Sequence, residues 1–336
     1  MKKILCYCEF NSRTGFGHYN RIKIILDILK LKNVDILTEN HLAASNFFQN
    51  QNIIKCKNIF SYLRKNFLKY KLLVIDPPYY PNQEKQQIIF SKKFKSIYEL
   101  KNKMFKVIWL TDEEKPCEKF CDLLLNDYPN SPKFKNFYKK KNKQVKLILG
   151  TYAFLYSKEI LKSNYGFKKK HIFISFGGDD PKNLALKFFK VFKSLEGKKF
   201  FIVNSKTHKI LKKFSDKKNL LIEKKKPMKK YITALANSTY YIANPSNIMF
   251  EAMALNIKGN VIPTQRRQNK MGLAFKKSKF VNLLPDYKKL NKKTLKKKLI
   301  SNFDDIKDKD LKFKKKLALK TQKMIKNFFT REVSNF

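Results

Sequence analysis

The sequence predicts an α/β protein built from two similar halves, and three observations support this. Short apolar runs typical of buried strands alternate with segments that carry apolar residues at helical spacing. Each half begins with a strand, a glycine turn and a helix in succession. The length, 336 residues, suits two domains of roughly 150 residues each. Because no glycine- or serine-rich linker separates the halves, we expect the two domains to pack together.

The first half opens with a predicted strand at residues 2–8 that leads into the segment Cys8–Arg21, CEFNSRTGFGHYNR. Gly15 and Gly17 permit a tight turn and a close approach of backbone N–H groups to a ligand, and the N-terminus of the following helix favours an anion. His18 lies in the first helical turn, where the helix dipole disfavours the imidazolium, so a neutral ring there can act as a general base. The alternative is a ring that caps the helix or packs in the core. The loop lacks the third glycine of a dinucleotide fingerprint, so NAD binding is not indicated.

Two later strands of this half lead into carboxylates. Residues 71–76, KLLVID, end at Asp76, and a strand at residues 104–110 is followed by Asp112. Ligands of open parallel sheets bind at the carboxyl ends of the strands, so Asp76 and the nearby Tyr79 are placed where a substrate can lie. The alternative is that both carboxylates only terminate strands. The other strands predicted here span residues 34–37, 121–125 and 146–149, and the lysine-rich segment 133–146 is expected on the surface.

The second half opens with a predicted strand at residues 171–176, HIFISF, followed by a glycine-acid turn and Pro181, which suits the first turn of a helix. We expect Asp179 or Asp180 to cap that helix. Later strands are predicted at residues 200–203, 220–222, 240–243 and 259–263, with helices at 227–236, 245–255 and from about residue 268. The final helix, about residues 316–328, is expected to pack against the first domain. The predicted domains are residues 1–160 and 161–320, followed by a C-terminal helical segment at 321–336.

The amino-acid composition limits the classes of molecule that the protein is expected to bind. The formal net charge is +49, yet only six of the 75 basic residues are arginines. Arginine is the residue that bidentate contacts with bases favour, and the lysines are spread along the whole chain. We therefore expect no specific nucleic-acid binding. A lysine-rich surface would still attract anionic substrates and anionic lipid headgroups.

The number of cysteines and the length of the apolar runs indicate in which cellular compartment the protein is expected. The five cysteines are odd in number and form no CxxC pair, so neither a disulfide framework nor a zinc site is expected. The apolar run after Lys2 and Lys3 already ends at Glu9, which makes it too short for a secretory signal. No apolar run in the sequence approaches the length of a membrane span. The predicted location is a reducing cytoplasm.

Three segments resemble a known family. They are GFGHYNR after the first strand, FISFGGDDPKNL at the start of the second half, and FEAMAL followed by VIPTQRRQN. They resemble the UDP-2,4-diacetamido-2,4,6-trideoxy-beta-L-altropyranose hydrolases of pseudaminic acid biosynthesis, which are relatives of the peptidoglycan N-acetylglucosaminyltransferases. Smaller pieces agree in order: LLVID, WLTDEEKPCEKFCDLLLND and LILGTYAFL. The resemblance covers nearly the whole chain and implies the glycosyltransferase-B (GT-B) fold, an α/β fold with two facing Rossmann-like domains and a central ligand cleft.

The resemblance also implies roles for individual residues. His18, the histidine of the GH-x-x-R motif, would activate the water that attacks the sugar, with Arg21 near the sugar or diphosphate. Glu251 would bind the uridine ribose; its alternative is an ordinary acid on a helix surface. Three segments depart from the family pattern: Pro77-Pro78 before Tyr79, Pro245-Ser246-Asn247 in place of a glycine pair, and QRRQN in place of the usual Asn-Gln order. The other implied substrate-binding residues are Gly17, Tyr79, Gly177, Gly178, Asn247, Gln268 and Asn269.

The expected function is hydrolysis of a UDP-linked diacetamido-trideoxyhexose to free sugar and UDP, by water that His18 activates, with no cofactor and no metal. Two other classes stay open. One is a GT-B glycosyltransferase that passes the sugar of a UDP-sugar to an acceptor for surface polysaccharide or glycolipid synthesis. The other is a non-catalytic binder of nucleic acid or of a surface. The predicted partners are a UDP-sugar and a peripheral membrane surface, and we expect a monomer.

Overall fold

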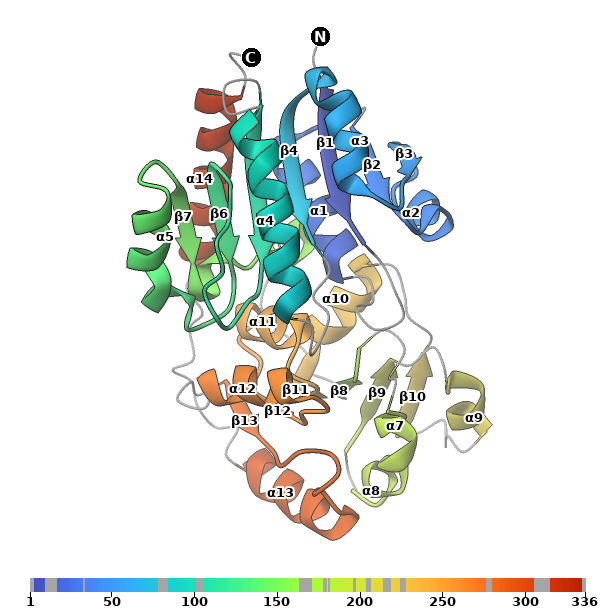
Figure 1. The fold of residues 1–336 in the computed structure, drawn as a ribbon. Helices are drawn as coiled ribbons and strands as arrows, with labels where there is room; N and C mark the ends of the chain where they lie inside the picture. The colour runs from blue at the N-terminus through green and yellow to red at the C-terminus, as the bar shows by residue number, and fades with distance from the viewer. Residues whose placement is uncertain are drawn as a thin grey trace. The chain divides into compact units, whose positions relative to one another are not determined.

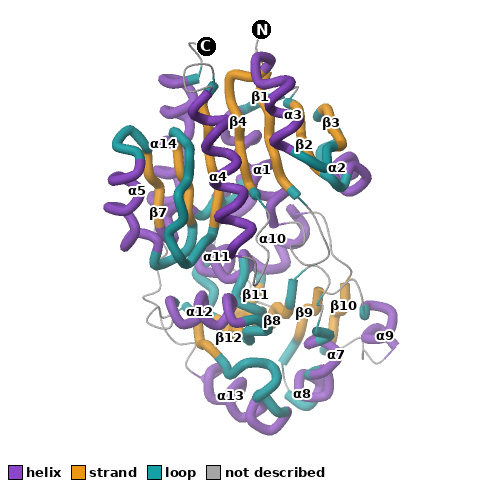
Figure 2. The backbone as a smooth tube through the Cα atoms, in the orientation of Figure 1, coloured by secondary structure: helices purple, strands orange, loops and turns teal. Residues whose placement is uncertain are grey.

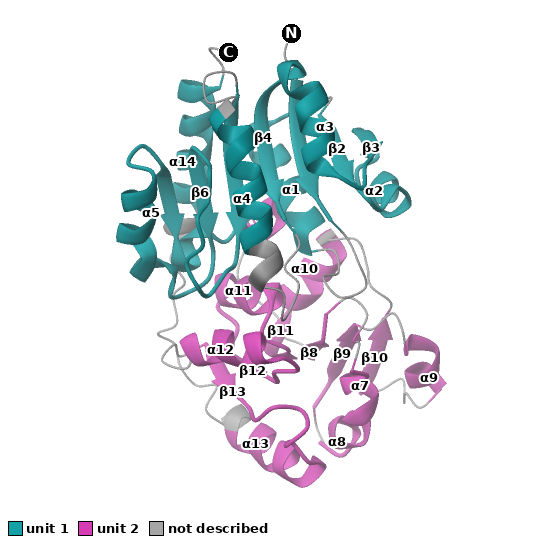
Figure 3. Ribbon diagram, in the orientation of Figure 1, with its two compact units in different colours: residues 1–155, 316–336 teal, residues 156–315 magenta. Residues whose placement is uncertain are grey.

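The structure is a computed structural model, and it describes residues 3–9, 17–32, 34–77, 84–100, 105–162, 171–177, 180, 182–195, 198–203, 207–213, 219–223, 228–275, 280–304 and 315–333. The chain forms two compact units (Figure 3). Unit 1 consists of Met1–Leu155 and Lys316–Phe336, and unit 2 consists of Tyr156–Lys315. The chain thus leaves unit 1, builds unit 2 and returns to unit 1 for its last helix.

Unit 1 is organised around a parallel sheet whose strand order changes direction beside the first strand (Figure 1). The chain adds β2 and β3 on one side of β1 and then continues on the other side with β4, which places a topological switch point between β1 and β4. In register, Cys8 at the end of β1 pairs with Asp76 at the end of β4. The described strands, in spatial order, are β3 (Asn52–Lys55), β2 (Asp35–Thr38), β1 (Lys3–Cys8), β4 (Tyr70–Asp76), β5 (Lys106–Thr111), β6 (Leu123–Asn126) and β7 (Lys146–Leu149).

Helices cover both faces of this sheet. On one face, α1 (Gly17–Leu29) buries its apolar stripe at Ile22, Ile25 and Leu26, and α14 (Lys315–Glu332) joins the same core through Ile325 and Phe328. The spacing of the α1 residues is the i, i+3, i+4 pattern of a helix with one buried face. The other face is covered by α3 (Ile59–Asn66), α4 (Glu84–Leu100) and α5 (Lys135–Lys141). The remaining helical segments of this unit are α2 (His41–Phe47) and the short 3-10 helices η1 (Phe67–Lys69), η2 (Ser131–Phe134) and η3 (Gly150–Ala153).

Unit 2 repeats this plan with a second parallel sheet (Figure 2). Its described strands, in spatial order, are β10 (Leu220–Glu223), β9 (Phe200–Val203), β8 (His171–Ser175), β11 (Ser238–Ala243), β12 (Gly259–Val261) and β13 (Val281–Leu283). On one face, α7 (Leu184–Lys187), α8 (Phe189–Lys193) and α13 (Lys292–Asp304) share a core. The other helices of the unit are α6 (Lys158–Lys162), α9 (His208–Lys213), α10 (Met228–Ala236), α11 (Asn247–Ala254) and α12 (Arg266–Ala274).

The structure differs from the single helix that the sequence predicts from Pro181 onward. Pro181 lies outside the described residues, and the helical part begins at Leu184 and is split into α7 and α8 at Phe188. Asp180 caps α7 as expected, because its carboxylate accepts hydrogen bonds from the backbone N–H groups of Leu184 and Ala185, both at 2.8 Å. Asp180 and Asn183 have positive φ angles of 44° and 51°, which asparagine and aspartate tolerate better than other side chains. The turn that contains Asp180 and Asn183 precedes the helix, which therefore begins only at Leu184.

Within the residues that the structure describes, no helix combines the length and apolar character needed to cross a membrane.

Candidate active site

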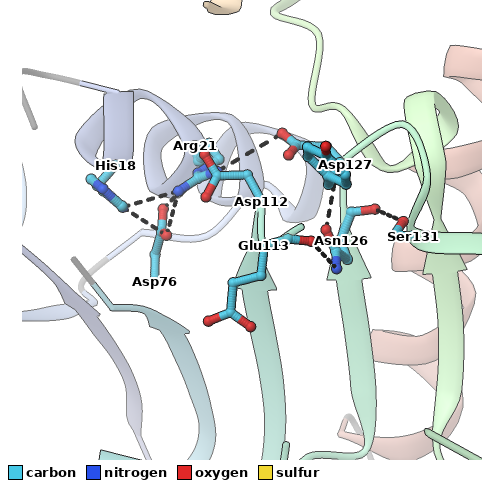
Figure 4. Close-up of polar contacts among 9 residues, drawn as sticks. His18, Arg21, Asp76, Asp112, Glu113, Asn126, Asp127 and Ser131 are labelled. Atoms are coloured by element: carbon cyan, nitrogen blue, oxygen red, sulfur yellow. Dashed lines mark hydrogen bonds and ion pairs between the residues drawn. The ribbon is translucent and has the colours of Figure 1, made fainter. Parts of the chain in front are cut away.

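A polar cluster lies at the carboxyl ends of β4, β5 and β6 in unit 1, beside the first turn of α1 (Figure 4). His18 Nδ1 lies 2.8 Å from Asp76 Oδ1, and Arg21 holds the same carboxylate with two bonds, Nε to Oδ2 at 2.8 Å and Nη2 to Oδ1 at 2.7 Å. The fold dictates this meeting, since α1 follows β1 and β4 is the strand beside β1. The three side chains are buried, with Asp76 fully inaccessible.

The neighbours of Nδ1 bear on which nitrogen of His18 carries the proton. Nδ1 lies 2.8 Å from a carboxylate oxygen of Asp76 and 3.0 Å from Arg21 Nη2. An ionised carboxylate only accepts hydrogen bonds, and the Arg21 guanidinium only donates them. Because Arg21 Nη2 already donates to Asp76 Oδ1 at 2.7 Å, we assign the proton of His18 to Nδ1, which donates a hydrogen bond to Asp76. Nε2 then keeps its lone pair and is the basic atom of the ring. Asp76 orients the imidazole and would stabilise the imidazolium that forms when Nε2 takes up a proton.

Arg21 is the cationic centre of the cluster. Its Nη1 lies 3.7 Å from Asp112 Oδ2 and 3.8 Å from Asp127 Oδ2, in addition to the two bonds to Asp76. Burial alone lowers the pKa of the Arg21 guanidinium, but the charges of Asp76, Asp112 and Asp127 outweigh burial and raise this pKa above its ordinary value. Arg21 is therefore permanently charged, and Nη1 is the one guanidinium nitrogen that is not bonded to Asp76.

A second buried ion pair stiffens the loops behind the cluster. Glu113 follows Asp112, but its side chain points away from Arg21 (Figure 4). Lys119 Nζ lies 3.0 and 2.9 Å from the two carboxylate oxygens of Glu113 and 5.0 Å from the centre of the Trp109 ring. Asn126, at the end of β6, donates from its side chain to the backbone carbonyl of Glu113. The loops after β5 and β6 are thus tied to each other.

Glu9 connects the carboxyl ends of β1 and β2. Its carboxylate accepts hydrogen bonds from the backbone N–H of Glu39, at 3.0 and 3.1 Å, and from the Thr38 hydroxyl at 3.2 Å. Burial raises the pKa of Glu9 to about 8, although the hydrogen bonds from Glu39 and Thr38 oppose this rise. The sequence offered one signal for Glu9, an acidic residue directly after a buried strand, and our sequence interpretation did not use it.

In unit 2, the predicted ligand-binding residues lie at the carboxyl ends of neighbouring strands. Gly177 follows β8 with φ +86°, a conformation that residues with a side chain rarely adopt. A Cβ at this position would lie 4.0 Å from Nδ2 of Asn244, which follows β11. Ser246 donates to the backbone and side-chain oxygens of Asn244, both at 3.2 Å, instead of capping the helix that follows. Asn247 begins α11, whose first turn carries no acidic residue. This helix end is suited to an anion.

Glu251 lies one turn further along α11 and is half-buried. Desolvation of its carboxylate raises the pKa of Glu251 to about 7. No hydrogen bond or ion pair to its carboxylate is found among the described residues. Tyr231 on α10 lies near enough that, after burial, the charge of Glu251 contributes to raising the pKa of its hydroxyl. Glu251 therefore has spare capacity to accept hydrogen bonds from a ligand.

Gln268 and Asn269 lie on α12, which follows β12, the strand beside β11. Gln268 Oε1 accepts hydrogen bonds from the backbone N–H and the hydroxyl of Thr264, both at 2.8 Å. This contact fixes the amide so that its NH₂ group remains as a donor. Gly272 permits α12 to pack closely, because a Cβ at this position would lie 2.6 Å from Leu283 Cδ1 and 3.5 Å from Pro245 Cγ. The last turn of α12 thus packs against β13 and against Pro245, which precedes α11.

The structure brings the predicted residues together in two groups. Gly17, His18 and Arg21 belong to the cluster in unit 1, whereas Gly177, Asn247, Glu251, Gln268 and Asn269 lie at the carboxyl edge of the sheet in unit 2. Tyr79 and Gly178 lie outside the described residues. Our sequence interpretation placed Asp76 and Asp112 at strand ends but did not pair them with His18 or Arg21. It assigned no role to Asp127, Glu9 or Thr264.

No protein-family model and no curated protein match this sequence. Solved structures do resemble its fold. MurG of Acinetobacter baumannii is 11% identical, with a TM-score of 0.59 over 97% of this chain and 95% of that chain. The spinosyn rhamnosyltransferase SpnG is 12% identical, with a TM-score of 0.61 over 98% of this chain and 96% of that chain. The UDP-GlcNAc 2-epimerase from Methanocaldococcus jannaschii is 12% identical, with a TM-score of 0.61 over 98% of this chain and 100% of that chain. The predicted fold class is confirmed: the chain has the α/β fold of the GT-B glycosyltransferases.

Proposed function

We propose that the chain is a nucleotide-sugar enzyme in which His18 is the general base. The observation that carries this proposal is the contact of His18 Nδ1 with the buried carboxylate of Asp76 at 2.8 Å. A base needs a free lone pair and a fixed orientation, and the Asp76 contact supplies both by holding the proton on Nδ1. The site lies at the carboxyl edge of a parallel sheet beside the switch point, where ligands of such sheets bind.

The nucleotide would bind to unit 2. Ribose presents two hydroxyl donors, and a carboxylate accepts both, which suits the half-buried Glu251. The diphosphate would meet the first turns of α11 and α12, whose cap residues Ser246 and Gln265 make no side-chain hydrogen bond to their helices. Gln268 and Asn269 would offer amide groups to the sugar or the diphosphate. Asn247, Gly177 and Gly178 would line the same site.

In the proposed reaction, a nucleophile attacks the anomeric carbon, the bond from that carbon to the diphosphate oxygen breaks, and UDP leaves with the bonding electrons. The proton of the nucleophile passes to His18 Nε2. The resemblance of the sequence to UDP-sugar hydrolases favours water as the nucleophile and a UDP-linked diacetamido-trideoxyhexose as the substrate. The products are then the free sugar and UDP.

The second candidate is transfer of the sugar to a hydroxyl group of an acceptor. It is favoured by the similar solved structures that are themselves glycosyltransferases, such as SpnG. The same base would serve, because a hydroxyl group and water both need a proton removed as they attack. The two candidates differ in whether turnover requires an acceptor.

The test is UDP release from the UDP-diacetamido-trideoxy sugar without an acceptor, for the parent chain, His18→Ala and His41→Ala. His41, an exposed residue of α2, is the matched control. We expect the parent and His41→Ala to release UDP and free sugar, and His18→Ala to lose at least ~10²-fold of the rate. If the parent binds UDP without turning over, the hydrolase proposal fails, and turnover with added acceptors tests the transferase. If His18→Ala retains the parent rate, the assigned base is wrong.

A further inference from the structure

Unit 2 carries a concentration of lysines on the outer surface of two packed helices. We define the lysine face by the exposed lysines of α8 and α13. The two helices contact each other and share a core that includes Phe192 and Leu299, so they lie side by side on one face of the sheet (Figure 1). The members of the lysine face are Lys190, Lys193, Lys292, Lys293, Lys296, Lys297 and Lys298.

Helical spacing aligns several of these lysines. Leu295 and Leu299 are buried and anchor α13 to the core. Lys293, Lys296 and Lys297 follow an i, i+3, i+4 pattern and point away from that core. Ile300 continues the same stripe at i+7 and is 46% exposed. The outer side of α13 thus combines a row of cations with one aliphatic side chain.

The lysine face is not neutralised by the protein in the part of the chain that the structure describes. Among the described residues, no ion pair is found for the seven lysines of this face, whereas Lys106 and Lys146 of unit 1 both pair with Glu332. Unit 2 holds more than half of the 75 basic residues and fewer than half of the 26 acidic residues. The described part of α8 and α13 contains no acidic residue before Asp304. The positive charge therefore remains available to an external partner.

We propose that the lysine face binds the anionic headgroups of a lipid membrane. A small anion would need donors that converge in a hollow, whereas these lysines are exposed along two adjacent helices and suit an extended negative surface. Lysine carries a compact charge on a flexible stem that can reach headgroups, and Ile300 can enter the boundary between headgroups and acyl chains. Nucleic-acid sites use arginine and stacked aromatic rings, and the exposed residues of this face include neither. The proposal is independent of the catalytic assignment.

The test uses the full chain and co-sedimentation with vesicles of phosphatidylcholine, alone or with about one third phosphatidylglycerol, in 0.1 M salt. The variant Lys293→Gln/Lys296→Gln/Lys297→Gln removes three charges from the lysine face. The matched control Lys320→Gln/Lys323→Gln/Lys326→Gln removes three exposed charges from α14 in unit 1. Circular dichroism melts verify that both variants are folded, as expected for exposed lysines.

We expect the parent to bind the anionic vesicles and not the neutral ones. A lysine near such a surface strengthens binding about fivefold, so the α13 variant should lose up to roughly 10²-fold in partition coefficient, while the α14 control stays within about threefold of the parent. Equal losses in the two variants would mean that overall charge, not this face, attracts the membrane, and would overturn the proposal. It would also fail if the parent bound neutral vesicles equally well, or bound a 20-base-pair RNA more tightly through the same three lysines.

Discussion

Glu251 provides the sharpest test of the nucleotide site, because its ionisation affects stability and ligand binding in opposite directions. Desolvation raises the pKa of Glu251 from 4.5 to about 7 in the folded chain. A shift of one pKa unit corresponds to about 1.36 kcal/mol, so ionised Glu251 costs the folded state on the order of 3 kcal/mol.

The sign of the pH dependence follows from proton counting. Between pH 4.5 and about 7 the folded chain binds more protons at this residue than the unfolded chain. The free energy of unfolding therefore falls as the pH rises through that window. Glu251→Gln has nearly the same shape and carries no charge, so it removes this fall. We expect the unfolding free energy of the variant to exceed that of the parent by on the order of 3 kcal/mol at pH 8, and to match it near pH 4.5.

Ligand binding should respond the other way. The carboxylate form accepts both ribose hydroxyls, so uridine should bind the parent about tenfold more tightly at pH 8 than at pH 6. The amide of Glu251→Gln accepts less well, and its affinity should be at least ~10-fold weaker at pH 8 and independent of pH. Uridine is a better probe than UDP here, because the terminal phosphate of UDP titrates near pH 6.

The assays are urea unfolding and uridine calorimetry across pH 5 to 8 for the parent, Glu251→Gln and Glu223→Gln. Glu223 lies on β10 of the same unit and controls for the chemical change. The reasoning is refuted if the unfolding free energies of the parent and Glu251→Gln run parallel across this range. A variant that gains stability but retains full uridine affinity would leave the desolvation argument intact and remove Glu251 from the ribose site.

Three further predictions concern unit 1. Asp76→Asn should lower the rate of UDP release at least ~10²-fold, because His18 loses the acceptor that orients it. The uridine affinity measured by calorimetry should stay within about twofold of the parent, and an unchanged rate would exclude Asp76 as the positioning residue. Lys119→Met leaves the charge of Glu113 buried without a partner, so the free energy of unfolding in urea should fall by about 3–5 kcal/mol. The double variant Glu113→Gln/Lys119→Met should recover most of this loss, and an equal loss in the single and double variants would contradict the prediction. Phe328→Ala should cost about 3–5 kcal/mol because Phe328 is fully packed against the sheet, whereas Met324→Ala, on the exposed side of α14, should cost under about 0.5 kcal/mol.

Central strands were predictable from the sequence because both of their faces are buried. The runs that became β4 and β8 are nearly continuous apolar segments, as expected for a parallel sheet covered on both sides. The edge strands β3 and β13 were missed, since their side chains are partly exposed and show no apolar run. The segment 133–146, expected as surface, contains α5, whose lysines conceal a single buried residue, Tyr138.

The site was only partly predictable for a related reason. Local chemistry singled out His18, which follows a glycine turn at a helix start. Its pairing with Asp76, 58 residues later, depends on β1 and β4 being neighbours in the sheet. Periodicity identifies strands but not their order, so Asp76 and Asp112 were predicted only as separate strand ends and not as partners of Arg21.

The return of α14 to unit 1 has a consequence for the order of folding during synthesis. Ile325, Phe328 and Val333 complete the core formed by α1 and one face of the first sheet. The ribosome makes these residues after all of unit 2, so the first unit to begin is the last to be completed. A nascent chain that ends before α14 lacks Ile325, Phe328 and Val333 and exposes the apolar groups of this core that the helix later covers. Unit 2 is contiguous in sequence, so all its residues are synthesised before α14. Its core can therefore form before the last helix of unit 1 has been made.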